Sequence, residues 1–422
     1  MALLQIIYSL FLSLLSKRFL FVLIGGVVAF LVTYLLTFAV IGWCRRAGWL
    51  DRPTVERRRL HKKAVPRLGG VAMFLSFVLV SLAVYATNFS QEVKGDELVR
   101  YWLLLAACIL IVIVHTYDDI KGLKPLPKLL AQTVAVVIVL GPFAGQFHGT
   151  FFFGFSNPFF HRDNLPWFQE SILTLFIHDT AITWLAVPAI LLTWFWIVGM
   201  MNTVNLIDGS DGLATGIVGL TGLFITIISW TLHQYSLAIL SAIFTGAVLG
   251  FLPHNWHPAK IFMGDSGSQF LGLGLAVLSI IGGAKAALAL MVLGIPILDV
   301  AVVMIGRIRR GQSPVHFDLN HIHHRLLATG LTVQQLCYVF YGFTFLFGVL
   351  ALFLSRIYKL LGLGLVGMTM IALFIWIDYR QRHGALPAVL DKPLPKSLEG
   401  QDGNADMDVT VGIPHPPSAG HL

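Results

Sequence analysis

The sequence predicts an all-α, polytopic integral membrane protein with about eleven transmembrane helices, and three observations lead to this fold class. Hydrophobic residues make up 56% of the 422 residues, charged residues only 12%, and the mean hydropathy is +0.79. Soluble domains need about 25% charged residues for their surfaces. Runs of roughly 20 apolar residues, enough for a helix to cross a bilayer, recur along the chain. Together these features exclude a water-soluble globule, a disordered chain and a coiled coil.

Each apolar run is expected to form one transmembrane helix. The runs cover residues 19–41, 69–87, 101–116, 129–147, 182–201, 213–231, 236–252, 268–281, 286–305, 333–355 and 360–377. Residues 1–18 are apolar but end in Lys17 and Arg18, which favours an interfacial segment over a signal peptide. The transmembrane domain, with its cytoplasmic active-site loops, then comprises residues 19–378. Residues 379–422 contain few large apolar side chains and are predicted to form a disordered cytoplasmic tail.

The distribution of basic residues predicts the orientation of the chain in the membrane. Nine Lys and Arg residues lie between positions 45 and 67, and a second basic group surrounds Arg307 and Arg325. Basic loops lie on the cytoplasmic side, so the N-terminus is expected outside and the C-terminus inside. The net charge of +8 is then explained by these loops and needs no nucleic acid partner. Five loops become cytoplasmic: residues 42–68, 117–128, 202–212, 253–267 and 306–330.

Acidic residues are scarce, and several lie in this one predicted cytoplasmic layer. Asp118 and Asp119 form an adjacent pair at the end of the third span. Ionisable groups this close to hydrocarbon are costly unless they have a partner or a function, which favours a catalytic role over a simple membrane boundary. Lys128 begins the next span, where an ordinary interfacial lysine is the alternative interpretation.

A second polar group follows the fifth span. Asn202, Asn205 and Asp208 are spaced by three residues and share one helix face, while Gly209 and Gly212 let the backbone approach a ligand closely. Oxygen ligands with glycine indicate a hard cation, a phosphate, or both. A calcium-binding EF-hand loop is excluded, because the twelve-residue pattern and its final Glu are absent.

Two further groups complete the layer. Asp265 lies between glycines at the start of a span, where a helix N-terminus would favour an anion such as a diphosphate; a plain loop is the alternative. Three histidines near position 322 could form a zinc site, but the oxygen-rich groups elsewhere and an adjacent arginine favour a phosphate clamp; a solvated basic loop is the alternative. These four residues are His321, His323, His324 and Arg325.

The four groups together predict a cytoplasmic site for a nucleotide diphosphate and an Mg²⁺-like ion. The sequence contains neither a G-x-x-x-x-G-K-[ST] loop nor a dinucleotide-binding glycine motif after a strand, so ATP-driven transport has no support. Because no soluble domain is apparent, the second substrate must be reachable from the bilayer, which indicates a lipid.

At these motifs the chain resembles the polyprenyl-phosphate N-acetylhexosamine-1-phosphate transferases, from about residue 51 to residue 325. The motifs occur in the family's order: Asp51-Arg-Pro, His61-Lys62, Pro66-Arg-Leu-Gly-Gly70, Asp118-Asp119, Asn202-x-x-Asn205-x-x-Asp208-Gly-x-Asp211-Gly212, Phe262-Met-Gly-Asp265-x-Gly267-Ser268 and His321-Ile-His-His324. The resemblance implies transfer of a sugar 1-phosphate from a UDP-amino sugar to undecaprenyl phosphate at the cytoplasmic face of the plasma (inner) membrane. It also implies a requirement for Mg²⁺ or Mn²⁺.

The histidine motif resembles that of the branch that uses UDP-N-acetylglucosamine for O-antigen, common-antigen or teichoic-acid carriers. Phospho-N-acetylmuramoyl-pentapeptide transferases usually have three consecutive histidines, and Ile322 interrupts such a run here. The expected product is therefore undecaprenyl diphosphate N-acetylglucosamine, with UMP released. A related hexosamine donor, or the muramoyl-pentapeptide donor, is the alternative.

The resemblance also implies a role for each matched residue. Asp265 and Asn205 would hold the metal, and Asp118 and Asp119 would lie where the lipid phosphate arrives, with Asp118 acting on it as base or orienting it. Four residues would bind the nucleotide sugar: Asn202, Asp208, Asp211 and Phe262. Seven would neutralise phosphates or border the site: Lys128, His321, His323, His324, Arg325, His61 and Lys62. Direct attack by the lipid phosphate is expected rather than a covalent aspartyl intermediate, because a phosphate monoester titrates near pH 6 and needs little help from a base.

Two other classes of function compete with this one. An ion transporter would place ionisable residues and broken helices near mid-bilayer, and Asp299, which follows Pro296 in the ninth span, is the feature that favours it. An inactive scaffold would have lost at least one aspartate, and none is lost. Small-residue helix faces allow a homodimer.

Overall fold

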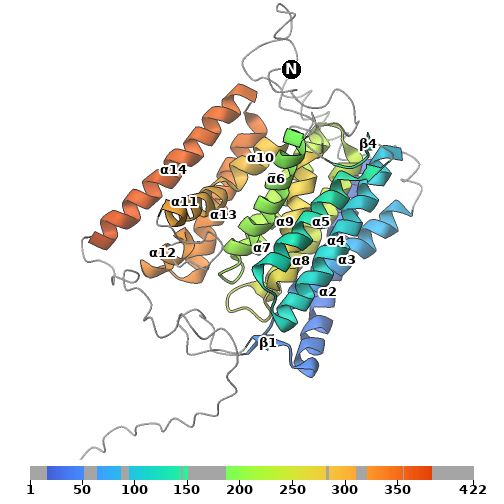
Figure 1. The fold of residues 1–422 in the computed structure, drawn as a ribbon, viewed down its shortest axis with the longest axis horizontal. Coiled ribbons are helices and arrows are strands. Elements are labelled where there is room, and N and C mark those ends of the chain that lie inside the picture. The colour runs from blue at the N-terminus through green and yellow to red at the C-terminus, as the bar shows by residue number, and fades with distance from the viewer. Residues whose placement is uncertain are drawn as a thin grey trace, which may run out of the picture.

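The computed structural model describes residues 17–51, 64–86, 95–143, 146–150, 187–281, 285–309, 321–354 and 356–382. Figure 1 shows their long helices lying side by side in one bundle. An apolar chain folds this way because lipid offers no hydrogen-bond partners, and a helix pairs its backbone N–H and C=O groups internally. Large side chains on the outer helices, such as Leu35 and Phe353, remain exposed on the surface that a bilayer would cover.

Thirteen helices are present in the described residues. They are α2 (Lys17–Ala47), α3 (Gly69–Tyr85), α4 (Gly95–Lys121), α5 (Pro125–Leu140), α6 (Val187–Ile207), α7 (Leu213–Thr231), α8 (Tyr235–Asn255), α9 (Gly264–Ile280), α10 (Lys285–Val292), α11 (Gly294–Arg309), α12 (Ile322–Ala328), α13 (Val333–Phe353) and α14 (Arg356–Arg382). The first helix thus begins within the predicted interfacial segment, and the last extends into the predicted tail. The remainder of both segments lies outside the described residues.

Six of these helices are long and apolar enough to cross a membrane: α2, α4, α6, α7, α8 and α13. The number becomes seven if α10 and α11, which are bent by 74° at their junction, form one broken span. The other predicted spans coincide with shorter helices, namely α3, α5, α9 and the apolar part of α14. The multi-pass, mainly helical architecture is therefore confirmed, whereas the number eleven and the orientation of the termini stay predictions.

Several polar groups that were expected in loops lie in helices. Helix α4 continues through Asp118 and Asp119, and α6 continues through Asn202 and Asn205. The expected loop boundaries were wrong because these side chains bond to neighbouring helices and do not need to reach water. Helix α5, by contrast, ends at Leu140, before the predicted boundary, where Gly141 adopts the left-handed conformation typical of a helix C-terminus.

Helix α9 lies at the centre of the bundle. It packs against α3, α4, α6, α7, α8 and α10, and its residues from Ser266 to Ile280 are all buried. Glycine allows one of the close contacts, since a Cβ atom on Gly272 would lie 2.4 Å from the Cα atom of Met201 in α6. The first turn of α9, which carries Asp265, is thereby fixed against its neighbours.

Two short antiparallel strand pairs interrupt the all-α architecture: β1 (Leu50–Asp51) with β2 (Val65–Pro66), and β3 (Pro142–Phe143) with β4 (Gln146–Phe147). The first pair is hydrogen-bonded to the segment that immediately precedes α9. The Phe262 amide donates to the Pro66 carbonyl at 2.8 Å, and Gly69 donates to the Phe262 carbonyl at 3.0 Å. The segments that precede α3 and α9 are therefore joined at one end of the bundle.

Candidate active site

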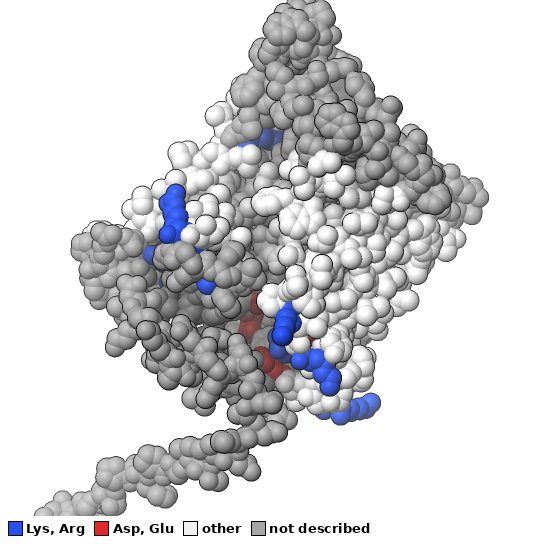
Figure 2. Space-filling view, viewed as in Figure 1, with Lys and Arg blue, Asp and Glu red and all other residues white. Residues whose placement is uncertain are grey.

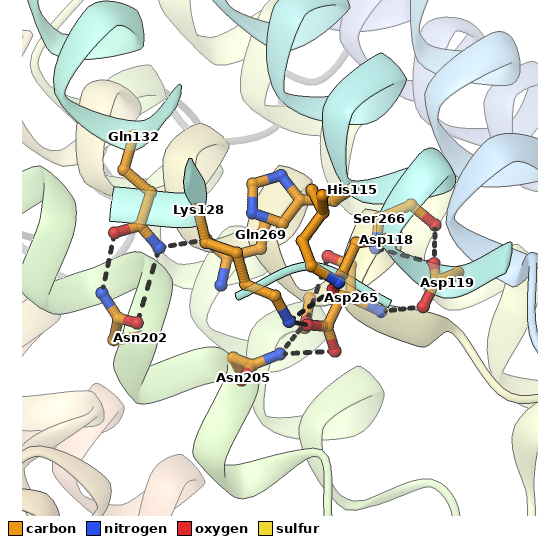
Figure 3. A network of polar contacts seen from close by, with 12 residues as sticks. His115, Asp118, Asp119, Lys128, Gln132, Asn202, Asn205, Asp265, Ser266 and Gln269 are labelled. Carbon is orange, nitrogen blue, oxygen red and sulfur yellow. Dashed lines mark hydrogen bonds and ion pairs between the residues drawn. The ribbon is translucent and has the colours of Figure 1, made fainter. Parts of the chain in front are cut away.

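A lysine bridges two carboxylates at this end of the bundle (Figure 3). The Lys128 ammonium in α5 lies 2.5 Å from Asp118 Oδ2 in α4 and 2.8 Å from Asp265 Oδ2 in α9. The Asn205 amide in α6 donates to Asp265 Oδ1 at 3.1 Å and to the Ser268 hydroxyl at 2.8 Å. We call Asp118, Lys128, Asn205 and Asp265 the ionic layer. In Figure 2, the acidic side chains visible on this face gather in one place, with basic side chains beside them.

Local structure explains why Asp118 and Lys128 meet. The Leu123 amide donates to Asp118 Oδ1 at 2.6 Å, so Asp118 closes the turn between α4 and α5. Pro125 begins α5, a position at which proline is favoured because the first helical N–H has no partner. Lys128 thus falls in the first turn of α5, directly opposite the end of α4. Its side chain is about one-quarter exposed and that of Asp118 is 5% exposed, so the pair is only partly screened by water.

Asp119 points to a different partner from its neighbour Asp118. Its carboxylate accepts hydrogen bonds from the Asp265 amide at 2.8 Å, the Ser266 amide at 3.0 Å and the Ser266 hydroxyl at 2.7 Å. Backbone N–H groups in the first turn of a helix lack intrahelical acceptors, and a carboxylate there satisfies them and suits the helix dipole. Asp119 therefore caps α9 from α4 and holds Asp265 in place.

We expect Asp119→Ala to act through Asp265. Loss of the cap leaves three donors without an acceptor, which should lower the stability in detergent by about 2 kcal/mol and turnover by roughly tenfold or more. Ser266→Ala removes only one of the three bonds and should have a smaller effect on both. Melting temperature and turnover would be measured together. A variant with wild-type melting temperature and no turnover would instead assign Asp119 a direct chemical role.

The pKa values of two carboxyl groups in the site are shifted strongly from their ordinary values. Burial alone would raise the pKa of the Asp265 carboxyl, but its contacts with Asp118, Lys128 and Asn205 outweigh burial and lower that pKa to about 2. Burial raises the pKa of Asp208 well above its ordinary value, and the charges of Asp265, Asp119 and Asp211 raise it further. Asp265 is therefore a permanent anion, whereas Asp208 lies in surroundings that already carry excess negative charge.

The Asp208→Asn variant should be more thermally stable than the wild type at pH 8. A carboxyl whose pKa is raised on folding is favourable when protonated, and its contribution to stability is lost as the pH rises through the folded-state pKa. The amide removes the cost of an ionised Asp208 in the folded protein. The gain in melting temperature should therefore shrink as the pH is lowered towards 4, where Asp208 is protonated. Melting curves of both proteins across this pH range would test it. A gain that does not change with pH would contradict the charge explanation.

The remaining part of the 202–212 motif is held by partners that sequence reasoning missed. Asp211 Oδ2 lies 2.7 Å from His257 Nδ1 and accepts from the Ala259 amide at 3.1 Å. The Asn255 side chain accepts from the Gly212 amide at 3.1 Å, and the Tyr341 hydroxyl donates to the Gly212 carbonyl. Asp211 thus fixes the loop after α6 against the end of α8, and its predicted contact with the nucleotide sugar stays a prediction.

The histidine motif lies against other helices. His321 Nδ1 is 3.0 Å from Asp299 Oδ2 in α11, and the Ile322 amide donates to Asp299 Oδ1 at 2.9 Å, so Asp299 holds the start of α12. His323 is buried with its ring 5.8 Å from that of His321, and the Arg325 guanidinium lies over Phe374 of α14. Asp299 is explained by these contacts, which removes the feature that favoured an ion transporter.

The other predicted site residues are placed as follows. Asn202 lies one helical turn from Asn205, where it contacts Gln132 of α5. Phe262 is half-buried between α8 and α9, next to the strand pair. His61, Lys62 and the side chain of His324 lie outside the described residues. The structure thus brings together the ionic layer and the 202–212 motif, while a phosphate clamp made with the histidine motif stays a prediction.

Helical spacing could have revealed residues that sequence reasoning missed. Gln132 and Gln269 follow Lys128 and Asp265 by four residues, and both are buried within the bundle. Ser266 and Ser268 flank Gly267 in a motif that was recognised, but only its Phe262 and Asp265 were given roles. The contacts of Asn255 and Tyr341 join distant segments and leave no local sequence signal.

The donor atoms of the site suit a hard divalent cation. Asp265 and Asn205 supply oxygen ligands, and the Asn205 nitrogen is already occupied, which leaves its oxygen for an ion. Within the described residues, no three His, Cys, Asp or Glu side chains form a ready-made cage. Mg²⁺ is commonly held by one or two carboxylates together with substrate phosphates, so these residues fit that ion.

Comparison with known proteins shows the family of the chain. The model of glycosyl transferase family 4 matches residues 101–283. A probable undecaprenyl-phosphate N-acetylglucosaminyl 1-phosphate transferase of Bacillus subtilis is 30% identical over 375 residues, which are 87% of this chain and 92% of that protein. A decaprenyl-phosphate N-acetylglucosaminephosphotransferase of Mycolicibacterium smegmatis is 32% identical, over 72% of this chain and 75% of that protein. A phospho-N-acetylmuramoyl-pentapeptide-transferase of Halalkalibacterium halodurans is 30% identical, over 78% and 96%. The chain belongs to the polyprenyl-phosphate hexosamine-1-phosphate transferases of glycosyl transferase family 4.

Proposed function

We propose that this protein transfers N-acetylglucosamine 1-phosphate from UDP-N-acetylglucosamine to undecaprenyl phosphate, at the cytoplasmic face of the plasma membrane. The products are undecaprenyl diphosphate N-acetylglucosamine and UMP, and the lipid would carry the first sugar of a cell-surface glycan. The observation that carries the proposal is the ionic layer, in which one lysine joins carboxylates from two helices at one end of a membrane bundle. The names of the relatives in Bacillus and Mycolicibacterium support N-acetylglucosamine as the sugar.

The reaction exchanges one phosphoanhydride bond for another. An oxygen of the lipid phosphate attacks the phosphorus that carries the sugar. A new P–O–P bond forms, the old bond to the uridylyl phosphate breaks, and UMP leaves with the bridging oxygen and its electron pair. No redox partner is needed. Because a phosphate monoester is mostly doubly ionised at pH 7, the protein's main tasks are to position the reactants and to stabilise negative charge.

The residues of the ionic layer can divide these tasks. Lys128 supplies a fixed positive charge beside the reacting phosphates, where partial exclusion of water strengthens its effect. Asp118 lies beside Lys128 and would orient the head group of the lipid phosphate as it enters from the bilayer. Asp119 stays bonded to the first turn of α9 and keeps Asp265 aligned. We favour direct attack because the lipid phosphate is already largely ionised at pH 7 and needs little help from a base.

We infer that Mg²⁺ or Mn²⁺ is bound by Asp265 and Asn205. When bound, the ion would neutralise charge on the diphosphate as a Lewis acid. The raised pKa of Asp208 supports a cation here, because the surrounding carboxylates disfavour a further negative charge unless one is present. Asp208, Asp211, Asn202 and Phe262 remain proposed contacts of the nucleotide sugar, and the histidine motif with Arg325 a proposed contact of its phosphates.

Release of UMP by the purified protein in detergent tests this proposal. The assay contains UDP-N-acetylglucosamine, undecaprenyl phosphate and Mg²⁺, and each is omitted in turn. UMP that appears only in the complete mixture supports the reaction, and a decaprenyl phosphate arm reports the tolerance for lipid length. Release with UDP-N-acetylgalactosamine or the muramoyl-pentapeptide donor alone would keep the chemistry but overturn the choice of sugar. No release with any donor would overturn the proposed function.

A further inference from the structure

Three amide side chains form a second polar layer beside the ionic layer. Gln132 donates from Nε2 to Gln269 Oε1 at 2.8 Å, and Asn202 donates from Nδ2 to Gln132 Oε1 at 3.1 Å. Asn202 Nδ2 also lies 2.8 Å from the Val198 carbonyl of its own helix. Gln132 and Gln269 are each 2% exposed. We call Gln132, Asn202 and Gln269 the amide layer (Figure 3).

The three helices that carry the amide layer, α5, α6 and α9, also supply three of the four residues of the ionic layer, and α4 adds Asp118. In α5, Gln132 follows Lys128 by four residues, and in α9, Gln269 follows Asp265 by four. In α6, Asn202 precedes Asn205 by three. Residues three or four apart lie on one face of a helix, so each helix presents one member to each layer. The amide layer therefore lies one turn further into the bundle than the ionic layer.

This repetition makes the contacts sensitive to the axial position of each helix. Sliding one helix by a turn, about 5.4 Å, would separate its residues in both layers at once. Buried amides that lose their partners cost free energy, whereas apolar side chains at these positions would tolerate a slide. A single buried asparagine can set the register of a coiled coil in the same way. Individual hydrogen bonds between membrane helices contribute little to stability on average, so their main effect is on alignment.

We propose that Gln132, Asn202 and Gln269 are positioning residues that set the register of α5, α6 and α9 and thereby keep Lys128, Asn205 and Asp265 in contact. The inference rests on the proposed function for its kinetic readout. Neither glutamine needs to touch substrate for this role, whereas Asn202 is also a proposed contact of the nucleotide sugar. Their effect reaches the reacting groups through the helices that carry both layers.

The kinetic test compares Gln269→Leu with Gln269→Glu. Leucine fills the space but removes the acceptor used by Gln132, and we expect turnover to fall at least about tenfold, as small misplacements of reacting groups do. Glutamate keeps an oxygen acceptor for Gln132 and should retain most of the activity. Gln132→Leu combined with Gln269→Leu should fall no further than Gln132→Leu alone, because Gln132→Leu already removes the bond between the two glutamines. Thr221→Val in α7, which removes a buried hydroxyl bonded within its own helix, is the matched control and should be unaffected.

A second measurement does not depend on activity. If the amide layer aligns the ionic layer, Lys128→Met should lower the melting temperature less in the Gln269→Leu background than in the wild type. Coupling of the two changes supports the inference even if no donor releases UMP, an outcome that would overturn only the proposed function. Additive melting temperatures, or wild-type turnover in Gln269→Leu, would overturn the inference.

Discussion

Asp265→Asn is expected to lower turnover by about 1,000-fold or more. Losses of this size occur in other enzymes when a group that helps to stabilise charge in the transition state is removed. The amide is nearly the same size, so the fold should persist. The substitution removes a carboxylate whose pKa is lowered to about 2, and it thereby weakens the proposed metal site. UMP release at saturating substrates measures the effect, and raising the Mg²⁺ concentration should restore part of the loss.

Glu97→Gln is the matched control for this change. Glu97 lies at the opposite end of α4 from Asp118 and accepts a hydrogen bond from Ser236. The same acid-to-amide replacement there should leave turnover within about twofold, since surface substitutions away from a site have small effects. Near-normal turnover of Asp265→Asn would remove Asp265 from the proposed metal site.

Lys128→Met should affect both stability and activity. Without the ammonium group, Asp118 and Asp265 face each other with no cation between them. Removing one partner of a buried ion pair commonly costs about 3 kcal/mol, and the partial exposure of Lys128 should reduce this to roughly 2 kcal/mol. Turnover should fall by about 1,000-fold, because the fixed positive charge beside the phosphates is lost.

A graded series makes this second result specific. Lys128→Arg keeps the charge but spreads it over a planar group, so it should recover stability better than turnover. Lys124→Met removes an exposed lysine just before α5 and should change neither property. A Lys128→Met protein with normal melting temperature and normal turnover would show that the lysine contributes neither to the stability of the site nor to catalysis.

The sequence was sufficient to predict the class of fold and to name all four residues of the ionic layer as site candidates, because apolar runs and scarce polar residues at their ends are local signals. It could not distinguish the roles of Asp118 and Asp119. Successive residues on a helix point about 100° apart, so one carboxylate turns to Lys128 and the other to the start of α9. That choice depends on which helices lie on either side of α4, and nothing in the adjacent residues specifies it.

The same limit applies to the histidine motif and to the buried glutamines. His321 was grouped with the phosphate-binding residues because it is basic, but its position follows from Asp299 and from the bend between α10 and α11. Gln132 lies in an apolar run, and the sequence alone does not show that its amide has a partner on a facing helix. Long-range pairing therefore decides which polar residues bind substrate and which hold helices in place.

The complete burial of α9 has a consequence for how the protein enters the membrane. A newly made helix first meets lipid alone, and Ser266, Ser268 and Gln269 would then lack the partners that they have in the finished bundle. Five of the helices that surround α9 precede it in the chain, and α10 follows. We therefore expect α9 to integrate stably only when those earlier helices are already in the bilayer to receive it. Chains that stop before α9 would be inserted in the membrane but would lack the acidic group that completes the site.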